Sequence, residues 1–211
     1  MAGILKFNNV EVFGSDGKVT SAGMPSGSIL QVQYHQFGHP TDEAGAMGSL
    51  SANTNYVVQA SGTTSGGGQT GVVDTTITPR ITGSSIWLQA HWFGELDAAV
   101  THDSMFFLWR SVGSSHTKLA SSYDGGSPTA GEIGISAPTL SYYADNVGTT
   151  GEVVSFQFFD AHGVSSGTSV IYKLGFATAN GSGMNGLYTN RTQGDATEVG
   201  VTSLCAIEIA P

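Results

Sequence analysis

The chain has 211 residues and a formal net charge of −9, with only seven Lys and Arg residues. These few cations are scattered, so the clustered positive charge that nucleic acids and anionic membrane surfaces require is missing. No apolar run approaches the ~20 residues of a membrane span, and the opening residues lack the apolar core of a signal peptide. Glycine is abundant, with 30 residues, and charged residues make up only 11%, which favours an all-β protein rich in turns.

Residues 1–27 differ in composition from the rest of the chain. Their one apolar run, within residues 4–13, is too short to fold alone, and turn residues follow it at Gly14–Gly17. We expect an extended arm over residues 1–27, packed on the body or on a partner, ahead of a β-sandwich domain over residues 28–211. The predicted anchor in this arm consists of Ile4, Leu5, Phe7, Val10, Val12 and Phe13.

The first strands of the body are predicted by alternation and by two-faced apolar character. Apolar and polar residues alternate through Ser28–Phe37, as in a half-buried strand. In contrast, Ser85–Gly94 and Ser104–Val112 carry apolar residues on both faces, so each should be covered on both sides. A second apolar face would leave a large patch on a monomer, and a closed cyclic assembly would bury it. We therefore expect a homotrimer whose interface includes Trp87, Phe93, Phe106 and Leu108.

The segment Glu152–Thr178 predicts a β-hairpin with long arms around a turn at Asp160–Thr168. One face of each arm is apolar, and these faces comprise Val154, Phe156 and Phe158, and Val170, Tyr172, Leu174 and Phe176. In the last strand, the single cysteine, Cys205, alternates with Ile207 and Ile209. We expect these three residues on the core side, with an unreactive thiol. Ten to twelve short strands without a convincing helix predict an antiparallel β-sandwich.

Patterns that could carry chemistry lack the context that the chemistry needs. His35 and His39 straddle a strand end and a Gly-Pro loop, with Asp42 and Glu43 nearby, rather than sharing a helix face. The G-x-G-x-x-G motif at residues 181–186 precedes a strand instead of a helix, and no serine lies in a nucleophile elbow. No catalytic pair stands out among the acids Asp145, Glu152, Asp160, Asp195 and Glu198. We expect no enzyme activity, no metal and no cofactor.

Several short motifs follow one another along nearly the whole chain. They are Met1–Lys6, Gly27–Val32, Ile77–Pro79 leading into Ile86–Trp92, Leu108–Arg110, Phe159–Asp160 ahead of Val170–Phe176, Tyr188–Arg191 and Ala206–Ile209. In order and spacing they resemble a family of virion structural proteins of marine tailed bacteriophages, cyanophage- and pelagiphage-like, described as tail-fibre, head-fibre or decoration proteins. The resemblance implies a jelly-roll-like β-sandwich that assembles as a trimer and is fixed to the particle through its N-terminus. It implies no catalytic residues.

These observations favour a non-enzymatic virion component, assembled in the host cytoplasm, with an N-terminal anchor and a β-sandwich head. The expected partners are further copies of the chain, other tail, portal-proximal or capsid proteins, and a glycan or protein of the host surface. A decoration protein without a receptor role is one alternative. A carbohydrate-binding or polysaccharide-degrading spike module is another, for which loop aromatics are candidates: Tyr123, Tyr142, Tyr143 and Tyr188.

Overall fold

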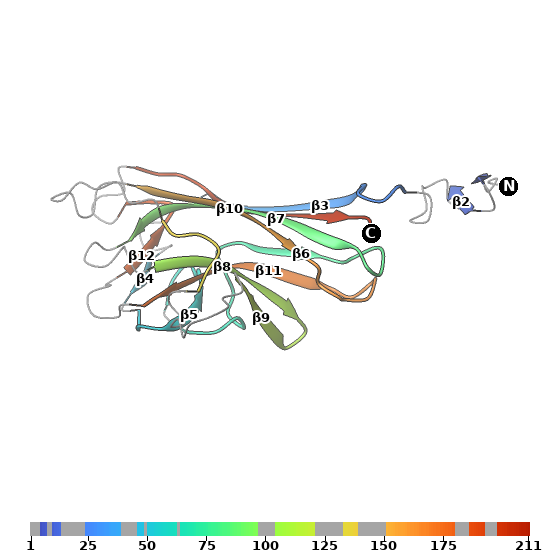
Figure 1. Ribbon diagram of the computed structural model, residues 1–211. Coiled ribbons are helices and arrows are strands. Elements are labelled where there is room, and N and C mark those ends of the chain that lie inside the picture. The colour runs from blue at the N-terminus through green and yellow to red at the C-terminus, as the bar shows by residue number, and fades with distance from the viewer. Residues whose placement is uncertain are drawn as a thin grey trace.

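The computed structural model describes residues 5–7, 10–13, 24–38, 46–48, 50–62, 64–96, 104–120, 133–138, 151–179, 186–192 and 198–211. Every regular element in these ranges is a β-strand (Figure 1). The strands are β1 (Leu5–Phe7), β2 (Val10–Phe13), β3 (Ile29–Phe37), β4 (Ala46–Gly48), β5 (Thr54–Val57), β6 (Asp74–Ile77), β7 (Ser85–Leu96), β8 (Ser104–Val112), β9 (Ser115–Leu119), β10 (Glu152–Asp160), β11 (Val170–Thr178), β12 (Gly186–Thr189) and β13 (Thr202–Ile209). No helix in the described ranges is long and apolar enough to cross a membrane.

Two antiparallel sheets form the body, which confirms the predicted all-β sandwich. The first sheet has the order β3-β13-β7-β10, with β12 beside the end of β7 and β4 beside β12. The second sheet has the order β11-β8-β9, with β5 and β6 following one another along the free edge of β11. Figure 1 shows the two sheets as stacked layers, with β3, β7 and β10 above β8, β9 and β11.

The pairing of the body strands is nested. If the three-residue strand β4 is set aside, β5 and β6 are counted as one interrupted strand and β12 and β13 as another, the first strand pairs with the last, as β3–β13. The second pairs with the seventh (β6–β11), the third with the sixth (β7–β10) and the fourth with the fifth (β8–β9). The chain is thus one long antiparallel ribbon with its tip at the β8–β9 turn. There Gly113 has a φ of 56°, as two-residue hairpin turns require.

The inner faces of the sheets meet in a core that is rich in aromatic residues. Trp92 on β7 lies with its ring centroid 4.8 Å from Phe106 on β8, which lies 5.1 Å from Phe176 on β11. Phe106 and Leu108 are fully buried in this core. Their prediction as oligomer-interface residues is therefore wrong, because the first sheet of the same chain covers the face of β8 that they occupy.

The predicted hairpin Glu152–Thr178 is also wrong in its pairing. Each arm is a strand with the expected apolar face, but β10 pairs with β7 in the first sheet and β11 pairs with β8 in the second. Residues 161–169 therefore cross from one sheet to the other. Alternation determines which face of a strand is apolar, and it carries no information about the neighbouring strand.

The N-terminal segment and the body meet at a definite boundary. Gly27 N–H donates to the Ala210 carbonyl at 3.0 Å, and Ala210 N–H donates to the Ser28 carbonyl at 2.8 Å, so the body begins here. Before this point, β1 and β2 pair with each other and with no other described strand. In Figure 1 this hairpin lies apart from the sandwich. The two strands contain the predicted anchor residues except Ile4, which lies outside the described residues.

Candidate functional site

The outer faces of the two sheets differ in how they are covered. On the second sheet, Phe107 and Trp109 point outward, yet they are 0% and 7% exposed. Gly67 lies so close to the Trp109 ring that a Cβ there would be 2.6 Å from it, and Ile135 packs on the same cluster. The chain thus covers this face with its own loops. On the first sheet, large apolar side chains remain exposed, among them Ile29, Val32, Tyr34 and Phe159.

Apolar side chains on the outer side of the first sheet lie in register across four strands. Val32 pairs with Ile207, Ile207 with Trp87, and Trp87 with Phe159, from β3 through β13 and β7 to β10. At the two ends of this row Val32 is 52% and Phe159 is 59% exposed, whereas between them Ile207 is 8% exposed and Trp87 is half-buried. With neighbouring strands ~4.8 Å apart, this row spans roughly 14 Å. We call the following set the outer apolar face: Ile29, Val32, Tyr34, Trp87, Phe159, Ile207 and Ile209.

Strands β3 and β13 both turn apolar side chains outward. On β13, Cys205 is half-buried and lies on the outer side with Ile207 and Ile209, so the prediction that these three face the core is wrong. The residue between the isoleucines, Glu208, is 0% exposed and points into the sandwich. Side chains alternate between faces along a strand, so the inward position of Glu208 places both isoleucines outside.

The buried carboxylate of Glu208 is held by four hydrogen bonds. Oε1 accepts from the backbone N–H of Arg80 at 2.8 Å, from that of Ile81 at 3.2 Å, and from Ser84 Oγ at 2.8 Å. Oε2 accepts from Gln31 Nε2 at 2.7 Å. A buried charge is costly unless it is hydrogen-bonded, and these donors meet that requirement. The network therefore fixes the register that keeps the apolar side chains outside.

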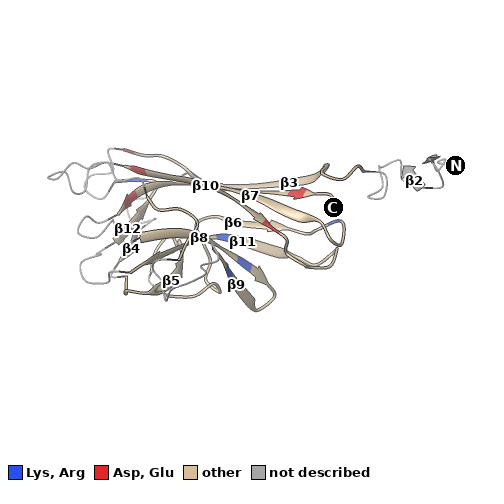
Figure 2. Cartoon of the chain, in the orientation of Figure 1, with Lys and Arg blue, Asp and Glu red and all other residues tan. Residues whose placement is uncertain are grey.

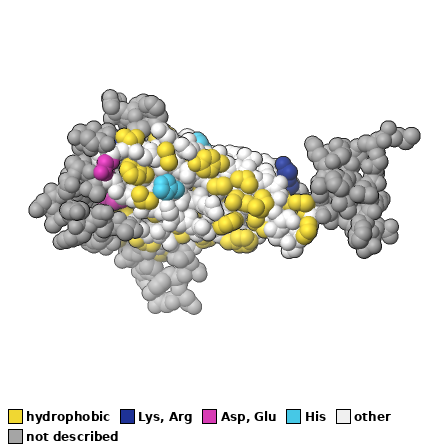
Figure 3. Space-filling view, turned by 90° about the horizontal axis from the view of Figure 1, so that it is seen from above, with side chains coloured by type: hydrophobic (Ala, Val, Ile, Leu, Met, Phe, Trp, Pro, Cys, Tyr) yellow, Lys and Arg dark blue, Asp and Glu magenta, His cyan; other side chains and the backbone are white. Residues whose placement is uncertain are grey.

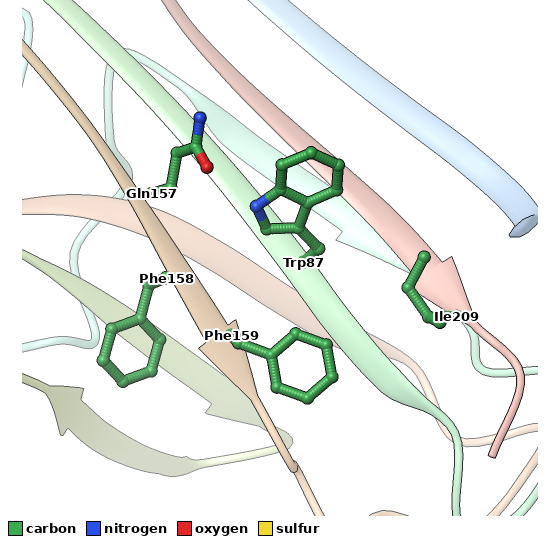
Figure 4. A pocket seen from close by; sticks show the side chains of 5 residues that line it. All are labelled: Trp87, Gln157, Phe158, Phe159 and Ile209. Atoms are coloured by element: carbon green, nitrogen blue, oxygen red, sulfur yellow. The ribbon is translucent and has the colours of Figure 1, made fainter. Parts of the chain in front are cut away.

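A shallow depression lies within the outer apolar face. It has a volume of about 310 Å³ and is lined by Trp87, Gln157, Phe158, Phe159 and Ile209. Figure 4 shows the Trp87 side chain on β7 with Gln157 and Phe159 from β10 on one side and Ile209 from β13 on the other. The lining offers apolar surface and one amide, and none of its side chains titrates. Such a surface binds by shape and burial rather than by acid–base chemistry.

The outer side of the first sheet has almost no charge. Among its outward-facing residues on β3, β13, β7 and β10, none is Asp, Lys or Arg, and the one acid is Glu95 at the end of β7, which is only 3% exposed. His91 on this side is hydrogen-bonded to Ser155 at 2.8 Å. Figure 2 shows few charged residues along the strands of this sheet. In Figure 3, hydrophobic side chains gather along the middle of this face, and the described charged side chains lie toward its ends.

The ionisable residues that the sequence singles out have structural contacts. Asp160 joins the two sheets: it accepts from Arg110 Nη1 at 2.7 Å through Oδ1 and from the Tyr172 hydroxyl at 2.8 Å through Oδ2. His162 is 6% exposed, and burial lowers its pKa below the ordinary range. His35 contacts Asp74 on β6 through Nδ1. Its neighbours in sequence, His39, Asp42 and Glu43, with which the pattern predicts no metal site, lie outside the described residues.

Two further acids lie near one end of β7. Burial raises the pKa of Glu152 to about 7, and the charge of Glu95 acts in the same direction, while a hydrogen bond from Leu96 N–H opposes them. Asp145 and Asp195 are outside the described residues. Within the described ranges, no group of three or more His, Cys, Asp or Glu side chains is placed to hold a metal ion.

The structure separates the four residues predicted for the oligomer interface. Trp87 and Phe93 point outward from the first sheet and are half-buried, whereas Phe106 and Leu108 lie in the core. Sequence reasoning missed the outward positions of Val32, Ile207 and Phe159. The fold and this face together define an antiparallel β-sandwich with one open, uncharged apolar face. No protein-family model matches the chain, and a search among curated proteins finds no similar one.

Proposed function

We propose that the chain is a non-enzymatic structural component of a tailed-phage virion, with a β-sandwich head on an N-terminal anchor. The observation that carries this proposal is the nested pairing of eight of the body strands, as β3–β13, β6–β11, β7–β10 and β8–β9. A ribbon folded over in this way into two layers supports a jelly-roll-like arrangement of the sandwich. Jelly rolls are typical of viral capsid domains and lectins.

The N-terminal hairpin supports the anchor role. A two-stranded hairpin is at best marginally stable alone in water, and β1 and β2 pair with no other described strand. A hairpin of this kind gains stability when it adds to the sheet edge of a partner, where main-chain hydrogen bonds supply affinity. The partner would be a tail, portal-proximal or capsid protein of the particle.

The order of short motifs along the chain resembles that of fibre and decoration proteins of marine phages. From this resemblance we expect the chain to assemble as a homotrimer. Multiple copies would give the open apolar face of the first sheet a role, because large apolar patches on soluble proteins mark contact sites. A fibre or tail position with host contact and a capsid-decorating position without it are both compatible with this architecture.

Deletion of residues 1–25 tests the anchor. Because Gly27 and Ser28 hydrogen-bond to the C-terminal Ala210, the truncation leaves this closure of the body intact. We expect a folded, oligomeric body that no longer incorporates into particles, measured by quantitative mass spectrometry of purified virions. Incorporation at the wild-type copy number would overturn the anchor role, and failure of the truncated chain to fold would place the arm in the core of the body.

A second candidate, a carbohydrate-binding spike module, is favoured by the aromatic depression of Figure 4. The exposed ring of Phe159 and the half-buried ring of Trp87 lie next to the amide of Gln157, and such a surface is one on which a sugar ring can stack. Incubation of the protein with host-surface polysaccharide tests it. Saturable binding that Trp87→Ala abolishes, or a loss of polymer chain length, would favour this function over a purely architectural one.

A further inference from the structure

We propose that the outer apolar face of the first sheet is the surface through which copies of this chain associate, so that its occupant is a second copy. The inference rests on the multi-copy assembly of the proposed function and assigns it a surface. It differs from the interface expected from sequence, because Phe106 and Leu108 are buried in the core. The row Val32–Ile207–Trp87–Phe159 would lie at its centre.

Charge favours a second copy over a charged partner. The chain has a net charge of −9, so most orientations of two copies bring like charges together. The outer side of the first sheet is the exception, since its four strands present no Asp, Lys or Arg there and only one Glu, the buried Glu95 at the end of β7. Depletion of charge with enrichment in aromatic residues is the composition of interface cores. An almost uncharged face needs no opposite charge on its partner, so it can pack against further copies of the chain in a closed cyclic assembly.

The size of the face is in the range of a small specific interface. Nine residues of β3 at ~3.4 Å each give a length of about 30 Å, and the three spacings of ~4.8 Å between four strands give a width of about 14 Å. The plane is therefore roughly 400 Å² on each copy, before the relief of the side chains is counted. A standard interface buries about 800 Å² per partner. The plane of the sheet alone thus amounts to about half of a standard interface, to which the relief of its large side chains adds.

The fold holds this face open. The four hydrogen bonds to Glu208 would be lost if β13 moved by one residue to bury Ile207 and Ile209. The apolar side chains therefore stay outside in the isolated chain, and covering them requires another molecule. The depression beside Trp87 offers that molecule a recess, and buried aromatic anchors in such recesses dominate binding energies at interfaces.

The test compares single lysine substitutions in the full-length chain. Val32→Lys and Phe159→Lys each place a charge on the row at a position more than half exposed, so both variants should fold. Thr76→Lys, at an exposed position on β6 of the second sheet, is the matched control. Light scattering should give an oligomer for the wild type and the control. For the two face variants we expect a monomer at micromolar concentration, with association weaker by on the order of a hundredfold or more, because like charges would meet across the interface.

The single cysteine supplies an independent readout. Cys205 lies on the same face, in register with Tyr34 on one side and Gln89 on the other. If copies meet here, a thiol reagent should label Cys205 slowly in the wild-type oligomer and on the order of tenfold faster in Val32→Lys, whereas Thr76→Lys should behave like the wild type. Urea unfolding of each variant shows whether it is folded.

Three outcomes would overturn the inference. The first is an oligomer of unchanged mass and unchanged Cys205 labelling in both face variants. The second is a wild-type monomer at micromolar concentration. The third is a monomer that binds a host glycan through this face, with binding lost in Phe159→Lys, which would identify a ligand platform. Incorporation into particles is measured separately through the deletion of residues 1–25, so failure of the virion role and failure of this interface are distinguishable.

Discussion

Gln31 Nε2 lies 2.7 Å from Glu208 Oε2 and 2.7 Å from the Thr78 carbonyl, so that one amide joins the edge strand β3 to β13 and to the end of β6. This contact lies on the opposite side of the sheet from Val32 and Ile207. This hydrogen bond on the inner side of the sheet holds β3 and β13 in an orientation that leaves their apolar side chains on the outer side. The first prediction follows from this network.

Replacement of Glu208 should be strongly destabilising. Glu208→Ala leaves the backbone N–H groups of Arg80 and Ile81 and the Ser84 hydroxyl without their carboxylate acceptor, and we expect a loss of about 3–5 kcal/mol in the free energy of unfolding, because several donors lose a charged acceptor at once. Glu208→Gln keeps one acceptor oxygen and should lose about 1–2 kcal/mol. Urea denaturation measures both. Equal, small losses in the two variants would mean that the network does not hold the register of β13.

The two donors to Asp160, Arg110 and Tyr172, should contribute unequally to the free energy of unfolding. Arg110→Ala leaves a buried carboxylate uncompensated, since the Asp160 side chain is only 6% exposed, and should cost about 3–5 kcal/mol. Tyr172→Phe removes one of the two hydrogen bonds to Asp160 and should cost about 1–2 kcal/mol. Tyr56→Phe, which removes a bond from Ser51 N–H, is a matched control at about 1 kcal/mol. If Arg110→Ala lowered the free energy of unfolding no more than the control does, the Arg110–Asp160 ion pair would not stabilise the fold.

Stability should fall as the pH rises through neutrality because of Glu152. Burial raises its pKa in the folded chain to about 7 from an ordinary value of 4.5, so the folded state binds this proton more tightly than the unfolded state. The contribution is fully present below about pH 4.5 and is lost as the pH rises through about 7. Since Glu152 is only partly buried, the loss should be about 1 kcal/mol.

The variant Glu152→Gln isolates this effect. It retains an oxygen that can accept from Leu96 N–H, a bond of 3.0 Å in the native chain, and it cannot ionise. Urea unfolding between pH 4.5 and 8.5 gives the free energy of unfolding at each pH. This free energy should fall less steeply with rising pH in the variant than in the wild type, and the variant should be the more stable of the two at pH 8.5. Identical slopes would show that Glu152 does not titrate in this range.

Gly94 should tolerate no side chain. It pairs with both Glu152 on β10 and Thr189 on β12, and a Cβ would overlap the backbone carbonyl of Tyr188 and the Trp92 ring. Backbone atoms in a paired ladder cannot yield as a flexible side chain can, so Gly94→Ala should cost about 3 kcal/mol or more. Gly38→Ala is the control, because its nearest atom would be 3.4 Å away. Thermal unfolding of both variants checks the difference.

Most strands of the body were predictable from local pattern. Ser104–Val112 is β8 with the predicted ends, and Ser85–Gly94 and Val153–Asp160 agree with β7 and β10 to within one or two residues. Each of these runs has the alternation or the two-faced apolar character that a pleated strand imposes. The predicted apolar faces of β10 and β11 were also assigned correctly, because a period of two needs no knowledge of the partner strand.

The sequence by itself determined that this chain is all-β, where its main strands lie, and that its few cations are scattered within a net charge of −9. Only the tertiary structure decided which strands are neighbours, since pairing depends on contacts distant in sequence: β10 pairs with β7 rather than with β11. It also decided which side of β13 faces out. That choice depends on four donors from elsewhere in the chain, which converge on Glu208. Their hydrogen bonds stabilise a buried carboxylate and leave Ile207 and Ile209 on the outer face, against the simple expectation from hydrophobicity.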